Sequence, residues 1–287
     1  MVFLRTKIVK GESYSYLVRS KWDGERKTSR QETVKYLGRT SEVSLGDIPF
    51  EFRFKPAITA FLSNIKEFDN KVSQKYITKT RQNTLKFLLA GDLSGLRSIY
   101  KNFRKTSSID NFYDRILRHT MYEIGTLWKN GRLDIGAEHV ASNTVIRLME
   151  SINVRLRQKD KAKTILICTP NGEFHAIPCM MLETFLSLSG YKIINLSPSA
   201  PTKSIKKYIE EKKPDLILIS ITLKDNVSAG KRLIKELKNY KTPMLLGGQA
   251  IESMSGRLSS FYKQNNLKII EKCSLNQLTK IVRQELI

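Results

Sequence analysis

The sequence predicts a multidomain protein of combined α and α/β class. We expect a small N-terminal β-meander, a bundle of four or five helices, and a C-terminal doubly wound, Rossmann- or flavodoxin-like parallel sheet of five strands. The first forty residues alternate with the period of strands, whereas from Thr164 onward apolar runs alternate with helical segments. The length of 287 residues favours two or three units. The expected boundaries are 1–40 for a basic β-meander module, 41–70 for a connector and helix, 71–160 for the helical bundle and 161–287 for the α/β domain.

The N-terminal module is predicted from three runs rich in Val, Tyr, Thr and Ile: Val2 to Lys10, Ser13 to Lys21 and Thr28 to Leu37. Asp23-Gly24 between the last two runs is a hairpin signal. Four aromatic residues lie among its basic side chains, which are Tyr14, Tyr16, Trp22 and Tyr36. The ending, Val34 to Arg39, resembles the small β module at the N-terminus of some archaeal transposase-like proteins. Basic side chains interleaved with aromatic ones favour contact with phosphates and bases. A self-packing sheet with a solvated charged face is the equal alternative.

The next segments predict helices. Residues 40–55 read as a connector, and Pro56 is well placed to begin a helix that ends near Phe68. From about Lys71 to Gln158 the apolar residues recur with helical spacing, Leu156 among those expected to face inward. Asp92, Asp110 and Asp134 are the expected N-caps, and Asn130-Gly131 is the expected end of one helix. Short-looped helices of this kind form a bundle.

Five strand-like runs of Ile, Leu and Val follow. They are Thr164–Cys168, Tyr191–Leu196, Asp215–Ile219, Pro243–Leu246 and Leu267–Ile270, with a last helix from about Leu275 to Leu286. Apolar strands that alternate with helices predict a parallel sheet covered on both faces. Such sheets bind ligands at the carboxyl ends of their strands. Glu173-Phe174-His175 follows the first strand, so we expect it at that edge.

His175 is one of three histidines in the chain. An imidazole can bind a metal or act as a base, and a carboxylate two residues away can fix its tautomer. An ordinary histidine on a strand-to-helix loop is the competing reading.

The composition restricts the class of partner. Fifty Lys and Arg against 27 Asp and Glu give a net charge of +23, which favours a polyanion such as nucleic acid. Residues 1–40 hold ten basic and four acidic side chains, and residues 161–287 hold twenty and ten. Because the excess of basic residues is not confined to the N-terminus, a generally lysine-rich composition is the alternative explanation of the charge. Three widely spaced cysteines, at 168, 179 and 273, fit reduced thiols. With neither a signal peptide nor an apolar run of membrane-spanning length, we expect a cytoplasmic protein without a membrane partner.

Four stretches together resemble the cobalamin-binding module of methionine synthases, corrinoid methyl carriers and light-sensing regulators. Glu173 to Pro178 is similar to the motif Asp-x-His-x-x-Gly of that family, and Ser220-Ile221-Thr222 is similar to its Ser-x-Leu or Ser-x-Thr. Gly247-Gly248 is similar to its Gly-Gly. In the bundle, Trp128 is followed after nine residues by Glu138-His139, a spacing found in the CarH-like adenosylcobalamin-dependent photoreceptor regulators, to which the resemblance is closest. The resemblance covers roughly residues 75–287.

The resemblance implies a role for each residue. His175 would be the lower axial ligand of cobalt in place of the cofactor's own base, and Glu173 would orient it. Ser220, Thr222, Gly247 and Gly248 would line the slot for the displaced nucleotide tail, where glycine allows close backbone approach.

The bundle residues would enclose an adenosyl group. In the photoreceptors Trp packs on this group, while Glu and His bond to it. The resemblance therefore assigns Trp128, Glu138 and His139 to cofactor binding. A core position is the competing reading for Trp128.

Two positions depart from these families. Pro178 stands where the motif has glycine, which puts the path of the loop in doubt. Lys129 stands where the better-known photoreceptors have a histidine directly after the Trp, which puts a light state with two histidine ligands in doubt. His119 is expected on the surface.

The sequence therefore favours a cobalamin-binding sensor or regulator. We expect adenosylcobalamin as cofactor, light as a candidate signal, DNA bound by the basic module, and leave a homo-oligomer open. The alternative is a corrinoid carrier that moves methyl groups between separate methyltransferase subunits, with methylcobalamin as its cofactor form. A degenerate module that has lost the cofactor is a third reading. No independent catalytic motif is present, so the chain is expected not to be an enzyme by itself.

Overall fold

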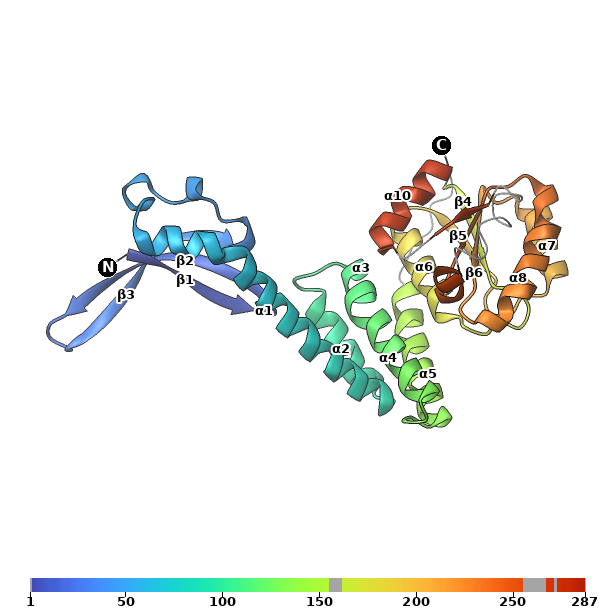
Figure 1. Ribbon diagram of the computed structural model, residues 1–287, viewed down its shortest axis with the longest axis horizontal. Coiled ribbons are helices and arrows are strands. Elements are labelled where there is room, and N and C mark those ends of the chain that lie inside the picture. The colour runs from blue at the N-terminus through green and yellow to red at the C-terminus, as the bar shows by residue number, and fades with distance from the viewer. Residues whose placement is uncertain (1, 155–161, 255–266, 271–272, 287) are drawn as a thin grey trace.

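The computed structural model describes residues 2–154, 162–254, 267–270 and 273–286. Figure 1 shows an N-terminal sheet at one end, an α/β domain at the other, and a long helix with a helical bundle between them. The predicted fold class is confirmed in all three parts.

The N-terminal module is an antiparallel sheet of order β1-β2-β3, formed by β1 (Val2–Val9), β2 (Glu12–Asp23) and β3 (Thr28–Arg39). Short 3-10 turns follow at Thr40–Glu42, Leu45–Asp47 and Phe50–Phe52. One face of the sheet packs on these turns and on the next helix, through a core of Val2, Leu4, Leu17, Val43, Ile48, Phe52 and Ile58. The predicted meander is therefore confirmed.

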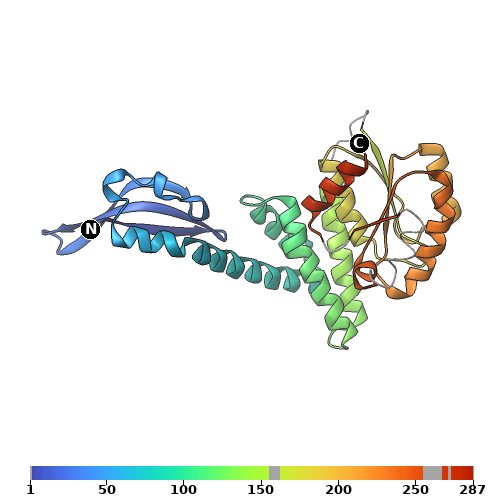
Figure 2. The ribbon, with the colours of Figure 1, turned by 45° about the horizontal axis from the view of Figure 1, so that its top comes forward.

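Helix α1 (Pro56–Leu89) is far longer than the sequence suggested. The prediction that the helix ends near Phe68 is wrong, and the expected boundary at residues 70 and 71 falls inside α1. Between Ala57 and Leu89 the chain has neither glycine nor proline, so nothing local interrupts the helix before Gly91. Figure 2 shows α1 running from the sheet into the bundle.

The bundle contains α1, α2 (Leu93–Phe103), α4 (Arg118–Lys129) and α5 (Ile135–Asn153), with the short α3 (Ile109–Asn111) and a π-helical segment, Phe112–Leu117, leading into α4. The caps of two helices are confirmed, because the side chains of Asp92 and Asp134 accept hydrogen bonds from Gly95 N and Gly136 N.

The N-cap prediction for Asp110 is wrong. Ser108 occupies that position, and the carboxylate of Asp110 instead accepts a hydrogen bond from Asn276. The inward position expected for Leu156 lies outside the described residues.

The C-terminal domain is a parallel sheet of order β5-β4-β6-β7-β8. Its strands are β4 (Thr164–Cys168), β5 (Lys192–Asn195), β6 (Leu216–Ser220), β7 (Met244–Gly247) and β8 (Lys268–Ile269). One face is covered by α6 (Ile177–Leu188) and α10 (Leu275–Glu285), the other by α7 (Thr202–Lys212) and α8 (Val227–Leu237), as Figure 1 shows. The predicted doubly wound sheet is confirmed.

The bundle and the α/β domain share one apolar core, which runs from the bundle helices through α6 and α10 to the sheet. Polar contacts reinforce this junction: Asp114 Oδ2 accepts from Leu275 N at 2.8 Å, and Arg118 donates to the carbonyl of Cys273 at 3.2 Å. Among the described residues, none of the helices has the length and apolar character needed to cross a membrane.

Candidate functional site

The loop between β4 and α6 lies at the topological switch point of the sheet. The chain passes from β4 to β5 on one side and then crosses to β6 on the other side of β4, so the crevice lies between the ends of β4 and β6. Open α/β sheets bind ligands at such a crevice. Glu173 and His175 follow β4 at this edge, where the sequence predicted them.

Glu173 is fully buried and joins two loops that are 49 residues apart in the chain. Its Oε2 accepts hydrogen bonds from Thr222 N (2.9 Å), Leu223 N (3.0 Å) and Asn226 Nδ2 (3.0 Å). Its Oε1 contacts His175 Nδ1 at 2.5 Å and accepts from the backbone N–H of His175 at 3.2 Å. These donors replace water around a buried charge, which would otherwise be costly. The carboxylate thus holds the loop after β4 against the loop after β6.

These contacts fix the protonation of the pair. Burial raises the pKa of Glu173, but hydrogen bonds from His175, Leu223, Asn226 and Thr222 outweigh it and lower the pKa to about 2. The hydrogen bond to Glu173 raises the pKa of His175, against the effect of burial, and the charges of Glu173 and Glu138 raise it further. With Glu173 ionised, Nδ1 of the neutral ring carries the proton and donates it to Oε1. Nε2 is then the nitrogen available to a ligand, on a side chain that is 45% exposed.

Ser220 and Thr222 lie at the end of β6 and just beyond it. Thr222 is half-buried and gives its backbone N–H to Glu173. Ser220 is 4% exposed, and its hydroxyl hydrogen-bonds to the thiol of Cys179 on α6. Burial raises the pKa of that thiol to about 12 even though Ser197 and Ser220 bond to it, so Cys179 is an inert core thiol.

The backbone of Ile221, in the loop after β6, requires glycine at position 248. Gly248 has φ of +113°, and a Cβ at this position would lie 2.3 Å from the carbonyl oxygen of Ile221. At Gly247, the last residue of β7, an added Cβ would meet Ile270 Cβ at 3.5 Å and Ile270 O at 3.8 Å, both ordinary contacts. The loops after β6 and β7 therefore pack backbone to backbone at the same edge, which shapes the crevice next to His175.

The three predicted bundle residues lie around the turn between α4 and α5. Trp128, in the last turn of α4, is 46% exposed, whereas Ile124 one turn earlier is fully buried. Glu138 and His139 lie in the first turn of α5 and bond to each other, with Oε2 2.9 Å from Nδ1. The other oxygen of Glu138 accepts from Ser142 Oγ at 2.6 Å. The charge of Glu138 acts on His175, so the start of α5 lies within electrostatic reach of the loop after β4.

Sequence reasoning missed two residues that hold the loop after β4. Asn226 donates to Glu173, and Ser199, which follows β5, accepts from Gly172 N at 2.9 Å and donates its backbone N–H to Glu173 O at 2.9 Å. Both are polar residues shortly after a strand, a signal that could have placed them at the same edge. Pro178 lies in the first turn of α6, where proline is tolerated, and His119 is exposed, as expected.

The donor set suits a cobalt-containing cofactor. A neutral imidazole nitrogen is a good ligand for a borderline metal, and an ionised carboxylate on the far nitrogen orients the ring and raises its basicity. Glu173 and His175 provide both groups, at a ligand-binding edge of the sheet.

Comparison with known proteins gives the cofactor class. Two family models, each described as a B12 binding domain, match residues 81–153 and 163–260. The chain is 23% identical over 139 residues to trimethylamine corrinoid protein 1 of Methanosarcina acetivorans, which is 46% of this chain and 64% of that protein. It is 22% identical over 138 residues to methionine synthase of Mycobacterium tuberculosis, which is 46% of this chain and 12% of that protein. The chain thus spans less than two thirds of these curated relatives.

The fold agrees with a solved structure. The monomethylamine corrinoid protein of Methanosarcina barkeri matches with a TM-score of 0.58 at 13% identity, over 72% of this chain and 98% of that one. The relatives are named methionine synthases and corrinoid proteins, so the comparisons do not support the expected closeness to photoreceptor regulators. The chain carries a B12-binding cap in its helical bundle and a Rossmann-like B12-binding domain after it, and its cofactor is a cobalamin.

Proposed function

We propose that this chain is a corrinoid methyl carrier that works with separate methyltransferase subunits. The observation that carries the proposal is the pair formed by buried, ionised Glu173 and half-exposed His175 at the switch point of the sheet. A bound cobalamin supplies a cobalt centre that takes up and gives away methyl groups, and methylcobalamin is the corresponding form. The relatives named trimethylamine corrinoid protein 1 support this reading over a regulator.

In this proposal His175 would hold the cobalt of a bound cobalamin through Nε2. Glu173 holds the proton on Nδ1, keeps the ring in one orientation and stays ionised because five groups donate hydrogen bonds to it. Ser220, Thr222, Gly247 and Gly248 shape the slot for the cofactor's tail. Thr222 and Ser220 do so through the contacts that fix the end of β6, and Gly248 through the close packing of two loops.

In the same proposal the bundle would shield a bound cobalamin from water, and Trp128 is the half-exposed apolar side chain that it would offer. The adenosyl-binding reading needs Glu138 and His139 directed at a ligand. In this structure they bond to each other, and Glu138 also bonds to Ser142. We take these internal bonds, together with the relatives named corrinoid proteins, as support for a methyl carrier rather than an adenosyl-binding photoreceptor with DNA as its target.

Absorption spectra of the purified chain with hydroxo-, methyl- and adenosylcobalamin test the proposal. We expect binding of the hydroxo and methyl forms, a spectrum that depends on His175, and no change of oligomer size when the adenosyl complex is illuminated. His175→Ala should change the spectrum, whereas the matched variant His119→Ala should not. If no form binds, or if His175→Ala leaves the spectrum unchanged, the ligand assignment is wrong. A light-dependent change of oligomer size would instead support the regulator.

A further inference from the structure

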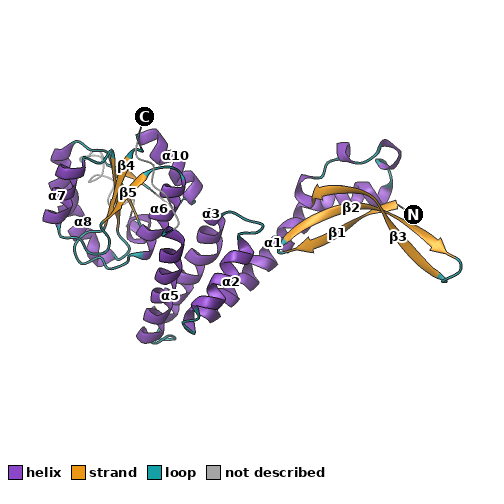
Figure 3. Ribbon diagram, turned by 180° about the vertical axis from the view of Figure 1, so that it is seen from behind, coloured by secondary structure: helices purple, strands orange, loops and turns teal. Residues whose placement is uncertain are grey.

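Among the residues that the structure describes, no other element covers one face of the N-terminal sheet. Strand register puts alternate residues on the same side, and Leu4 and Leu17 mark the packed side. The opposite side carries the even-numbered residues of β2, such as Tyr14 and Tyr16, together with the residues of β1 and β3 that pair with them. Figure 3, seen from behind, shows the strands in front of α1, and none of the described helices or loops lies over this side. We call it the open face.

The open face carries four aromatic side chains. Tyr14, Tyr16 and Trp22 come from β2, and Tyr36 comes from β3 opposite Tyr16. The rings of Tyr16 and Tyr36 lie 5.1 Å apart. Trp22 is 71% exposed and Tyr36 is 53% exposed. Exposed aromatic rings on a sheet cost hydration free energy, so a partner that covers them would gain apolar burial.

Cations lie between these rings on the same face. Arg5 pairs in register with Tyr16, Lys7 with Tyr14, and Arg39 with Tyr14 on the other side. Arg5 is held in place by a hydrogen bond to Gln31 Oε1 at 2.9 Å. Arg5 and Lys7 are exposed, and Arg39 is 45% exposed. The face therefore alternates flat rings with positive charge.

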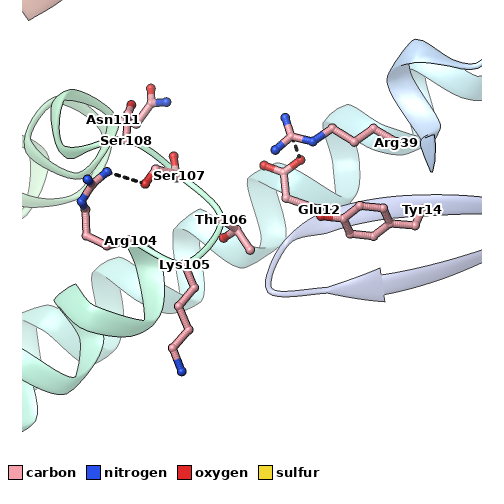
Figure 4. Close-up of a pocket in the computed structure, with 9 residues that line it drawn as sticks. All are labelled: Glu12, Tyr14, Arg39, Arg104, Lys105, Thr106, Ser107, Ser108 and Asn111. Atoms are coloured by element: carbon pink, nitrogen blue, oxygen red, sulfur yellow. Dashed lines mark hydrogen bonds and ion pairs between the residues drawn. The ribbon is translucent and has the colours of Figure 1, made fainter.

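A groove continues the open face toward the bundle. It has a volume of about 540 Å³ and is open to solvent, and Figure 4 shows Tyr14 and Arg39 on one side and the α2–α3 loop on the other. That loop contributes Arg104, Lys105 and hydroxyl groups. Glu12 is the acidic residue of the lining and lies 3.9 Å from Arg39. The positive path thus runs from the sheet across to the bundle.

We propose that the open face and this groove bind single-stranded nucleic acid. Aromatic rings stack on unpaired bases, which a duplex does not offer, while Arg and Lys neutralise the phosphates along the strand. The net charge of +23 and the excess of ten basic over four acidic side chains in residues 1–40 fit a polyanion. This site is separate from the cobalamin edge and does not depend on the methyl-carrier proposal.

The test is fluorescence anisotropy of the full chain with labelled 15-nucleotide DNA and RNA, single-stranded and duplex. We expect single strands to bind more tightly than duplexes. Five phosphate contacts, from Arg5, Lys7, Arg39, Arg104 and Lys105, would weaken binding roughly 100-fold between 50 and 200 mM salt. Removing Trp22 and Tyr36 together, as Trp22→Ala/Tyr36→Ala, should weaken binding by at least about tenfold. Arg104→Ala/Lys105→Ala should lower the slope of log affinity against log salt by about 1.4.

The matched control replaces an exposed ring and an exposed lysine on α7, as Lys203→Ala/Tyr208→Ala, and should bind like the unchanged chain. Circular dichroism and cobalamin binding check that each variant is folded. The proposal is overturned if single strands do not bind, if duplexes bind as tightly, or if the Trp22/Tyr36 variant behaves like the control. Displacement by polyglutamate as readily as by unlabelled single strands would also overturn it, since charge alone would then explain binding and an acidic protein would be the better partner.

Discussion

Replacing Glu173 by glutamine removes a charge without changing the shape of the side chain. In the folded chain Glu173 lies fully buried and accepts from five donor groups: the ring and backbone nitrogens of His175, the backbone nitrogens of Thr222 and Leu223, and Asn226 Nδ2. In glutamine, an NH₂ group that can only donate hydrogen bonds replaces one of the two carboxylate oxygens. That amide nitrogen would face either the His175 nitrogens or the three groups on the β6 side, and in both cases donors would point at a donor.

The magnitude follows from the pKa. Hydrogen bonds lower the pKa of Glu173 from 4.5 to about 2 despite burial, which corresponds to about 3 kcal/mol of stability at neutral pH. Because this pKa is lowered by folding, the stabilisation is present above pH 4.5 and is lost as the pH falls toward 2. Glu173→Gln should therefore destabilise the α/β domain by about 2–4 kcal/mol at pH 7 and by much less near pH 2.

Hydrogen–deuterium exchange reports this directly, because the N–H groups of Thr222 and Leu223 lose their acceptor. We expect faster exchange in peptides that cover 169–176 and 220–226, together with a lower urea midpoint by circular dichroism. Glu183→Gln is the matched control, since the carboxylate of Glu183 is half-buried in the same domain and accepts a hydrogen bond from Asn195 Nδ2 at 2.8 Å. A loss below about 1 kcal/mol at pH 7, or one that does not shrink in acid, would refute the reasoning.

Three further predictions concern other positions. The affinity for hydroxocobalamin should rise with pH up to the pKa of His175 and level off above it, because only the neutral ring offers Nε2. The hydrogen bond to Glu173 raises this pKa above its ordinary 6.5, so Glu173→Gln should move the break in the profile to lower pH. A flat profile would contradict this. Gly248→Ala should lower the free energy of urea unfolding by about 2–4 kcal/mol or abolish soluble expression, because its Cβ would lie 2.3 Å from the carbonyl oxygen of Ile221. Gly247→Ala should lower it by less than about 1 kcal/mol, and equal losses for the two variants would exclude the steric explanation. Asp134→Ala should remove the N-cap of α5 and destabilise the bundle by about 1 kcal/mol, measured by thermal unfolding, and an unchanged midpoint would count against the cap.

Local patterns predicted most of the fold. The β4 strand has the bounds read from its apolar run, and Asp92 and Asp134 cap their helices, because these features depend on neighbouring residues only. The cap predicted at Asp110 does not form, because its carboxylate accepts a hydrogen bond from Asn276, far along the chain.

The site was predicted in part for the same reason. The contact of Glu173 with His175 is local and was foreseen, while its bonds to Thr222, Leu223 and Asn226 join loops that only the folded sheet brings together. The need for glycine at 248 depends on the backbone of Ile221 and has no local signal.

Helix α1 determines how motion at one end of the molecule reaches the other. Its 34 residues give a length of about 51 Å, and it contacts both the N-terminal sheet and the bundle. Gly11, in the turn between β1 and β2, has φ of +80° and sits close to Tyr76, which lies past the middle of α1; an added Cβ at Gly11 would lie 2.2 Å from the Tyr76 ring. A tilt of the bundle by about 10° would displace the far end of a straight arm of this length by roughly 9 Å. Small movements of the cap over its cofactor would thus become large movements of the aromatic face.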